Sequence, residues 1–550
     1  MKTIIHYINV VIWVLVGLYL ALAILINIPV VQSSIGDQVA TALSHKLNTK
    51  VHVGRVDLGL FNRIIIDDVH LLDQKGKPLL RATRLSAKFD YIELIRGRVS
   101  ISSAQLFGLN ANLYKETADA KPNFQFVLDS LASKDTTQHR PLDITLRSLI
   151  IRHGELSYNQ LDQPRKSSFD MKHLHVKNLS SHILLNALRD DSLNLYVKRL
   201  SLNEQAGLNI RSFTFKLAAN KTHAALTDFE LQLPASRLSL GDINASYRLQ
   251  DGKLTPGSLN YTGSILPSSI LPNDILALVP KARKFSKPVL VRSSFSGTDH
   301  TLSLQRFEAS MPKSLQHQTF SAPADFHVSL SGEFNKIGST LQWMTNISEL
   351  TVDRDGMGLL ASDIPDIVGR MQYFSYRGKA SGQGRAFSTK GTLQSGTGNA
   401  DVDFAMNNGK FIGHVATNGF DLRQLLNNDQ FGKLITDINV SGNINHKFYK
   451  AQATITDIDF NGYSYQNINL DGTFNRGLLD GTLSIDDPNL AADIKGSLNT
   501  NTHSTAANLT ATISHFMPSA LHLLKKQLGE ASYTANIAAS FTGRDLNSAV

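Results

Sequence analysis

The feature that most constrains this chain is an alternation of apolar and polar residues that recurs from about residue 50 to the end. Residues 85–91 (LSAKFDY), 326–330 (FHVSL) and 468–474 (INLDGTF) each place apolar side chains at every second position. Successive side chains of a β-strand point to opposite faces, so this period predicts strands with one apolar and one polar face. Turn pairs such as Asn408-Gly409 and Asn461-Gly462 separate the strands and predict hairpins with antiparallel neighbours.

The length of the chain extends this pattern beyond one ordinary domain. With about 12 residues for each strand and its turn, the region after residue 50 would supply roughly 40 strands, which stack to about 190 Å at ~4.8 Å per strand. An open twisted sheet does not tolerate so many strands. The sheet therefore splits into filled sandwiches or curls around its apolar face, and alternation alone does not distinguish these two arrangements. An outer-membrane barrel is a third arrangement, which the lack of a clear aromatic girdle disfavours.

Helical patterns are few and fall between strands. We expect helices within residues 267–287, 421–434 and 518–528, as insertions at strand junctions. A short amphipathic helix is also expected over residues 32–48, with Ser33 or Ser34 as its N-cap and Asn48 at its end. This helix either plugs one end of the β-core or lies on a lipid surface.

The N-terminus carries an apolar run from Val10 to Ile26 without a charged residue. With its flanks it is long enough to cross ~30 Å of hydrocarbon, so residues 1–31 are predicted to be a transmembrane anchor. Its defining residues are Val10, Trp13, Leu18, Tyr19, Leu25 and Ile26. Lys2 precedes the run and no further cation occurs until Lys46, which predicts a cytoplasmic N-terminus and an extracytoplasmic body. A cleavable signal peptide is the alternative, but the apolar run continues past the small residues Ala21 and Ala23.

Composition argues against most kinds of chemistry. The chain has no cysteine, which excludes disulfides, cysteine-ligated metal and thiol catalysis. The formal charge of +9 is spread along the sequence, and no basic stripe with interleaved aromatic residues indicates nucleic-acid binding. The usual hydrolase, metalloprotease and phosphate-binding signatures are missing. We therefore predict no enzymatic activity, no cofactor and no metal.

Four local groups contain residue types that occur in metal, nucleotide or catalytic sites. His173 and His175 have a metal-ligand spacing but are interpreted as exposed histidines. Residues 353–356 (DRDG) resemble part of a calcium loop without its twelfth-position carboxylate, which favours a tight turn. Gly382 and Gly384 are interpreted as loop residues. The carboxylate pairs 67–68 and 486–487 are interpreted as solvated positions at strand ends.

A family resemblance joins several of these segments. The anchor, the short helix, residues 51–56 (VHVGRV), residues 85–101, the run 148–158 (SLIIRHGELSY) and residues 263–304 together resemble AsmA and TamB-like proteins. The resemblance implies a single-pass anchor in the inner membrane, a periplasmic body curled into a trough with an apolar interior, and transport of phospholipid toward the outer membrane. It also implies a role in assembling and secreting outer-membrane proteins with a barrel partner of the TamA or BamA type. The chain departs from TamB-like proteins at residues 544–550, which end within what looks like a continuing strand and not in the terminal domain that contacts the barrel partner. The chain is therefore expected to be either part of a longer protein or a shorter AsmA-like relative.

From these observations we expect a mainly β protein, with residues 49–550 forming a long antiparallel sheet curled into an elongated open trough, continuing beyond residue 550 in a full-length protein. The expected function is a bridge-like conduit for phospholipid between inner and outer membranes in outer-membrane biogenesis. A subunit that aids outer-membrane protein assembly and a passive scaffold are the alternatives. The residues expected to line the trough and contact phospholipid acyl chains are Val99, Ile101, Leu109, Leu113, Val440, Ile444, Leu470, Phe474, Leu483, Ile485, Ile494 and Leu498.

Overall fold

The computed structural model describes residues 2–26, 28–59, 63–89, 101–132, 147–166, 168–189, 192–250, 253–314, 316, 319–360, 364, 366–499, 505–523 and 531–543. The chain divides into two compact units, Met1–Pro288 and Val289–Val550, and each is described by itself. The prediction of a mainly β fold with a large antiparallel sheet is confirmed, because 27 of the described strands are assigned to one sheet.

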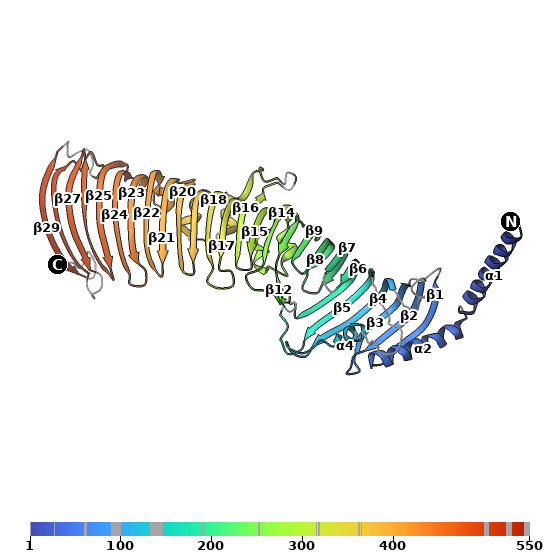
Figure 1. Ribbon diagram of the computed structural model, residues 1–550. Coiled ribbons are helices and arrows are strands. Elements are labelled where there is room, and N and C mark those ends of the chain that lie inside the picture. The colour runs from blue at the N-terminus through green and yellow to red at the C-terminus, as the bar shows by residue number, and fades with distance from the viewer. Residues whose placement is uncertain are drawn as a thin grey trace. The chain divides into compact units, whose positions relative to one another are not determined.

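Unit 1 begins with two helices and continues as a ladder of strands (Figure 1). Its elements are α1 (Lys2–Ile26), α2 (Pro29–Leu47), β1 (Val51–Gly59), β2 (Arg63–Leu72), β3 (Pro78–Phe89), β4 (Ile101–Lys115), α4 (Gln125–Ala132), β5 (Ser148–Gln160), β6 (His173–Arg189), β7 (Ser192–Glu204), β8 (Asn209–Asn220), β9 (His223–Gln232), β10 (Arg237–Ser239), β11 (Ile243–Ser246), β12 (Leu249–Gln250), β13 (Lys253–Leu254), β14 (Asn260–Ile270), η1 (Pro272–Ile275) and η2 (Pro280–Lys284).

Unit 2 is a ladder in which each strand pairs with the next one along the chain, and Figure 1 shows β15 to β29 side by side in that order. Its elements are β15 (Val289–Thr298), β16 (Thr301–Pro312), β17 (Ala324–Asn335), β18 (Gln342–Val352), α5 (Arg354–Leu360), α6 (Asp366–Gly369), β19 (Phe374–Gln383), β20 (Ala386–Ser395), β21 (Gly398–Asn407), β22 (Lys410–Asp421), α7 (Leu422–Leu426), β23 (Phe431–Asn443), β24 (Phe448–Phe460), β25 (Tyr463–Asn475), β26 (Leu478–Asp487), β27 (Leu490–Asn499), β28 (Thr505–Phe516) and β29 (Tyr533–Gly543).

The hairpin turns confirm the sequence prediction where they are described. Asn408 and Gly409 have φ of 48° and 81°, and Asn461 and Gly462 have φ of 52° and 81°. Two consecutive positive φ angles give the two-residue turn whose twist matches that of antiparallel strands. One neighbouring pair departs from the prediction, because β4 and β5 are parallel. The chain between them includes α4, and a parallel pair requires such a crossover connection.

The strand count was overestimated. The described residues contain 29 strands, because individual strands such as β8, β23 and β25 are 12 or 13 residues long without their turns. The sheet therefore uses more residues for each strand than the average that the prediction assumed.

The predicted helical insertions were partly wrong. Within residues 267–287, β14 continues to Ile270 and two short 3₁₀ helices follow. Within residues 421–434, only Leu422–Leu426 is helical, and Asp421 caps it by accepting hydrogen bonds from two backbone N–H groups. Residues 518–523 form turns, and residues 524–528 lie outside the described part. The sequence patterns missed α4, α5 and α6.

The short helix after the anchor also begins earlier than predicted. It starts at Pro29, and the Ser33 hydroxyl donates to the carbonyl of Pro29 within the helix instead of capping its start. Proline suits the first turn because its missing N–H would have no partner there. Asn48 ends the helix in the left-handed conformation, as expected.

Candidate functional site

The predicted anchor residues lie on α1. Val10, Trp13, Leu18 and Tyr19 are exposed along this helix, whereas for Leu25 and Ile26 only the helical backbone is described. Within the described residues, no helix meets the requirements of length and apolarity for a membrane crossing.

The beginning of the sheet is closely packed beneath α2. A side chain at Gly36 would meet the backbone of Val53 and Gly54 at 3.3–3.4 Å, and the Ser44 hydroxyl accepts a hydrogen bond of 2.9 Å from the amide of Val51. Val53 is 1% exposed, and the strand pairing continues from it through Val69 and Ala82 to Leu109, which is 6% exposed. Helix α2 therefore packs on β1, where a filled core begins.

The predicted lining residues of unit 1 fall on or near this packed region. Leu109 belongs to the filled core, so its side chain lacks the exposure of a trough wall, and Leu113 is half-buried. Ile101 is the first residue of β4. Val99 lies outside the described residues.

In unit 2 the alternation places the predicted residues in straight rows across the strands. Leu470 of β25 is opposite Leu483 of β26, which is opposite Ile494 of β27. A second row joins Phe474, Leu479 and Leu498, and a third joins Ile468, Ile485 and Ala492. Directly opposed residues on neighbouring strands point to the same face, and positions two apart share that face. These three rows therefore form one apolar face over β25, β26 and β27.

The same face continues toward β23, with one exception among the predicted residues. Val440 is opposite Ala451, which is opposite Gly472, so it belongs to the apolar face. Ile444 does not, because β23 ends at Asn443 and Ile444 lies in the following turn, 52% exposed. The alternation in the sequence runs one residue past the end of the strand.

Between the first and second of these rows, glycines leave a hollow. Gly472, Gly481 and Gly496 are opposite one another, and they lie between the Leu470–Leu483–Ile494 row and the Phe474–Leu479–Leu498 row. The resulting hollow has a volume of about 530 Å³, and its wall includes Tyr449 and Leu509. The backbone of the three glycines, which carry no side chains, forms its floor. The sequence pattern did not single out this strip, although the three glycines are visible as breaks in the apolar alternation.

Toward β20 the same face is filled by aromatic rings. Ring centroids are separated by 5.6 Å for Phe387 and Phe404, 6.0 Å for Phe404 and Phe411, 6.1 Å for Phe411 and Tyr449, and 5.9 Å for Tyr449 and Phe474. Such offset ring contacts stabilise neighbouring strands. This aromatic line shares Tyr449 and Phe474 with the wall of the hollow.

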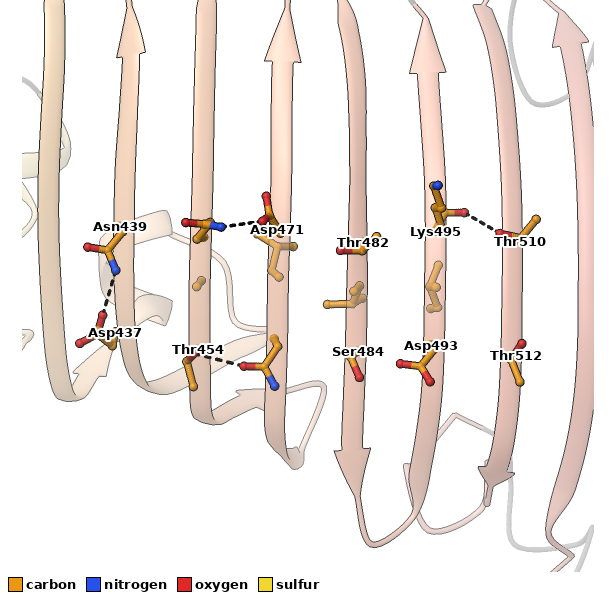
Figure 2. Close-up of a pocket in the computed structure, with 16 residues that line it drawn as sticks. Asp437, Asn439, Thr454, Asp471, Thr482, Ser484, Asp493, Lys495, Thr510 and Thr512 are labelled. Carbon is orange, nitrogen blue, oxygen red and sulfur yellow. Dashed lines mark hydrogen bonds between the residues drawn. The ribbon is translucent and has the colours of Figure 1, made fainter.

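The opposite face of these strands is polar (Figure 2). It also contains a hollow, of about 580 Å³, lined by alternate residues such as Asp471, Thr482 and Lys495. Many of its polar groups bond one another across strands: the Gln452 amide donates to Asp471 at 2.6 Å, and the Thr454 hydroxyl donates to Asn469 at 3.2 Å. A solvated outer face explains this arrangement.

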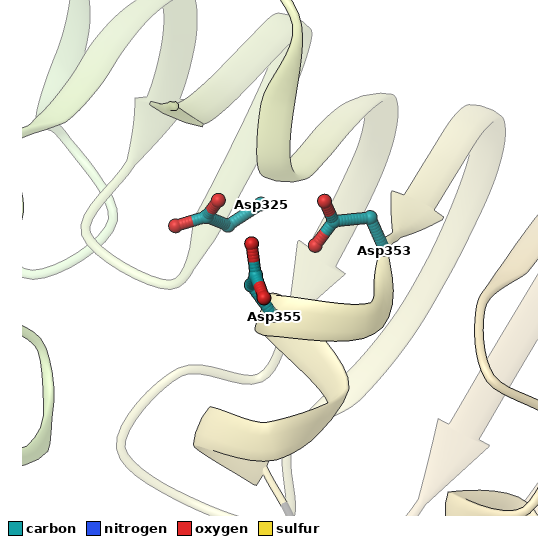
Figure 3. A group of neighbouring side chains, drawn as sticks. All are labelled: Asp325, Asp353 and Asp355. Carbon is teal, nitrogen blue, oxygen red and sulfur yellow. The ribbon is translucent and has the colours of Figure 1, made fainter. Parts of the chain in front are cut away.

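Three carboxylates in unit 2 lie close enough to share a cation (Figure 3). Oxygen atoms of Asp325, Asp353 and Asp355 are within 4.8 Å of one another. However, the Lys313 ammonium group forms ion pairs with Asp353 and Asp355, and the hydrogen bond to Asp353 raises the pKa of Lys313. A protein cation therefore already offsets part of the negative charge of the cluster. Residues 353–356 do not form the predicted tight turn: Asp353 accepts a hydrogen bond of 2.9 Å from the amide of Gly356 at the start of α5, as an N-cap does.

The histidines were wrongly predicted to be exposed. His173 is buried, with its Nδ1 at 3.1 Å from Asp170, and the Nε2 atom of His175 lies 3.2 Å from Glu155. Each ring therefore has a carboxylate partner of its own, which explains both residues without a metal. Among the described residues, neither histidine belongs to a cluster of metal-ligating groups.

One member of each carboxylate pair was wrongly placed in solvent, whereas the Asp68 side chain is 50% exposed and Asp486 is exposed, as predicted. Asp67 pairs with Arg55 and Arg84 at 2.9 and 2.6 Å, and the hydrogen bond from Arg84 lowers its pKa. Asp487 is 4% exposed and accepts a 2.6 Å hydrogen bond from the Tyr463 hydroxyl. These aspartates hold neighbouring strands together.

Of the two glycines predicted in a loop, Gly382 lies within β19, whereas Gly384 lies in the turn that follows.

Comparison with known proteins adds no constraint: no family model matches the chain, and no curated protein or solved structure matches it significantly.

Proposed function

We propose that this chain is a membrane-anchored conduit for phospholipid, in which α1 is the inner-membrane anchor and the apolar face of unit 2 is the inner wall of a periplasmic trough. The observation that carries the proposal is the exposure of that face. Leu470, Leu479, Leu509 and Ile537 are 38–49% exposed, although they occupy the positions that would form a core if a second sheet covered them.

The free energy of these side chains favours an apolar occupant. Covering apolar surface is worth roughly 25 cal/mol per Å², and soluble proteins rarely expose large contiguous apolar patches without a binding role. An acyl chain lying along the strip of Gly472, Gly481 and Gly496 would cover both flanking rows. No covalent chemistry is required of the protein, and the AsmA and TamB resemblance suggests the same function.

The first experiment blocks the hollow. In a triple variant, Leu470→Arg, Leu483→Arg and Ile494→Arg place three cations on the apolar face. We expect phospholipid that copurifies with the full chain, measured by mass spectrometry, to fall at least about tenfold, because burying a charge in an apolar site is costly.

The matched control adds one cation to the opposite face of each of the same strands, with Asn469→Arg, Thr482→Arg and Ser497→Arg. Circular dichroism establishes that both triple variants are folded. Undiminished copurified lipid in the folded apolar-face variant, or an equal loss in the control, would contradict the proposal.

The second candidate function is guidance of unfolded outer-membrane proteins by strand addition. It is favoured by β29, which pairs with β28 and with no other described strand. An unpaired edge can accept an added strand through its backbone groups. Photo-crosslinkers along β29 would give adducts with nascent barrel proteins if this function applies, and lipid adducts alone or no adducts if it does not.

A further inference from the structure

Two connections of unit 1 form one surface at the same edge of the sheet. The β5–β6 connection covers residues 161–172, and the segment after β14 covers residues 271–288. They are joined by a backbone hydrogen bond of 3.0 Å from Phe169 to Ala277. We call the described residues of these two connections the loop-edge patch.

The loop-edge patch exposes four large apolar side chains. Leu161 is 56% exposed, Met171 74%, Leu278 50% and Val279 47%. Each connection contributes two of them, and Met171 and Leu278 flank the Phe169–Ala277 hydrogen bond in sequence. Single exposed apolar residues are ordinary, but a group of four on two joined loops indicates an interaction surface.

The same patch is basic. Lys166, Lys172, Lys281 and Arg283 are all exposed, and within the described part of the chain none of these four forms an ion pair. Arg165, also exposed, donates only to the neutral Gln205 amide, at 2.7 Å.

Of the three carboxylates in the patch, Asp162 is exposed and offsets one cation, whereas Asp170 and Asp274 are engaged within the loops. Asp170 is buried and accepts hydrogen bonds from the backbone of Lys166 and Lys172. Asp274 accepts from the amide of Ala235 and the hydroxyl of Ser236, both at 2.7 Å. These two aspartates shape the loops from within, so cations dominate the outer surface.

We infer that the loop-edge patch docks on the surface of an anionic phospholipid bilayer. Apolar side chains among exposed cations fit the interface between headgroups and acyl chains, and each Lys or Arg near an anionic surface adds to the attraction. A hydrophilic polyanion would use the cations but leave Leu278, Val279 and Met171 in water. The inference does not rest on the conduit, because the patch belongs to unit 1 and the proposed lipid hollow to unit 2.

The absence of cysteine makes a site-specific test direct. A single Leu278→Cys variant of the full chain is labelled with an environment-sensitive fluorophore and mixed with vesicles that contain a lipid-borne quencher. The label at Leu341, 41% exposed in unit 2, is the matched control. The readout reports proximity of the patch to lipid whether or not α1 inserts.

We expect quenching at position 278 with vesicles of phosphatidylglycerol and phosphatidylethanolamine, and little with phosphatidylcholine alone. Charge reversal at Lys166, Lys172, Lys281 and Arg283 to Glu should reduce this quenching at least about tenfold. The same reversal at Lys379, Arg385, Lys433 and Arg476, four exposed cations of unit 2, should leave it unchanged.

Several results would overturn the inference. Equal quenching with neutral vesicles, or quenching that survives reversal at the patch, would remove the electrostatic contact. The quenching could also be abolished by inorganic phosphate but not by chloride at the same ionic strength. This result would assign the cations to a small-anion site. Equal quenching at position 341 would indicate general association of the chain with vesicles.

Discussion

The start of the sheet in unit 1 and strands β25 to β28 of unit 2 have the same alternating sequence pattern, yet they differ in what lies on the apolar face. In unit 1, Val53, Ala82 and Leu109 are all nearly inaccessible to solvent, and α2 packs on β1 at the start of this core. In unit 2, Leu470, Leu479 and Leu509 keep 38–49% of their surface exposed. Alternation thus specifies which face is apolar, and a separate element decides whether that face becomes a core.

The difference between the two regions is tested most strongly by truncating one leucine to alanine in each and comparing the loss of stability. Leu109→Ala should lower the free energy of unfolding by about 2–4 kcal/mol, because it leaves a cavity in a packed core. Leu479→Ala, at a position 49% exposed, should cost about 1 kcal/mol or less. Urea denaturation followed by circular dichroism measures the first, and the fluorescence of Trp343 in unit 2 follows the second. Equal costs would remove the distinction between the regions.

The glycine strip sharpens the comparison within unit 2. A Cβ atom at Gly481 would lie 2.8 Å from the backbone oxygen of Asp471, whereas the nearest atom to a Cβ at Gly472 is 3.9 Å away. Gly481→Ala should therefore destabilise unit 2 by about 1–2 kcal/mol, through a forced backbone shift. Gly472→Ala should be neutral or slightly stabilising, and thermal unfolding distinguishes them. A Gly472→Ala variant as unstable as Gly481→Ala would show that the hollow is not open at this strand.

The packed region contains a titratable pair that makes its stability sensitive to alkaline pH. Burial and the 2.8 Å hydrogen bond to Asp73 raise the pKa of Tyr114 to about 12. The folded state thus holds this proton more tightly than the unfolded chain, whose tyrosine pKa is about 10. The stabilisation is complete below pH about 10 and is lost as the pH rises toward 12.

Tyr114→Phe should remove this dependence and cost about 1 kcal/mol at neutral pH, through the lost hydrogen bond. Unfolding of unit 1 measured between pH 8 and 12 checks both statements. An unchanged alkaline profile in the variant would assign the dependence to other groups.

From the sequence, the face to which a side chain points could be predicted better than its burial and its contact partners. Leu470, Leu483 and Ile494 share a face because their strands have a fixed period of two, which is a local property. The burial of Leu109, the burial of Asp487 beside Tyr463 and the capping role of Asp353 depend on contacts that the period of two does not encode. Ile444 was misplaced because nothing in the alternation marks the residue at which a strand ends.

The most direct test of lipid binding to the apolar face compares crosslinking at two consecutive residues of β26. Leu483 shares the apolar face with Leu470 and Ile494, whereas Thr482, the preceding residue of the strand, points to the opposite, polar face (Figure 2). A benzophenone amino acid is introduced at either position of the full chain, irradiated in membranes, and analysed by intact-mass spectrometry. We expect phospholipid adducts at position 483 and few or none at position 482. No adduct at 483, or equal yields at both positions in folded protein, would contradict the proposal that this face carries lipid.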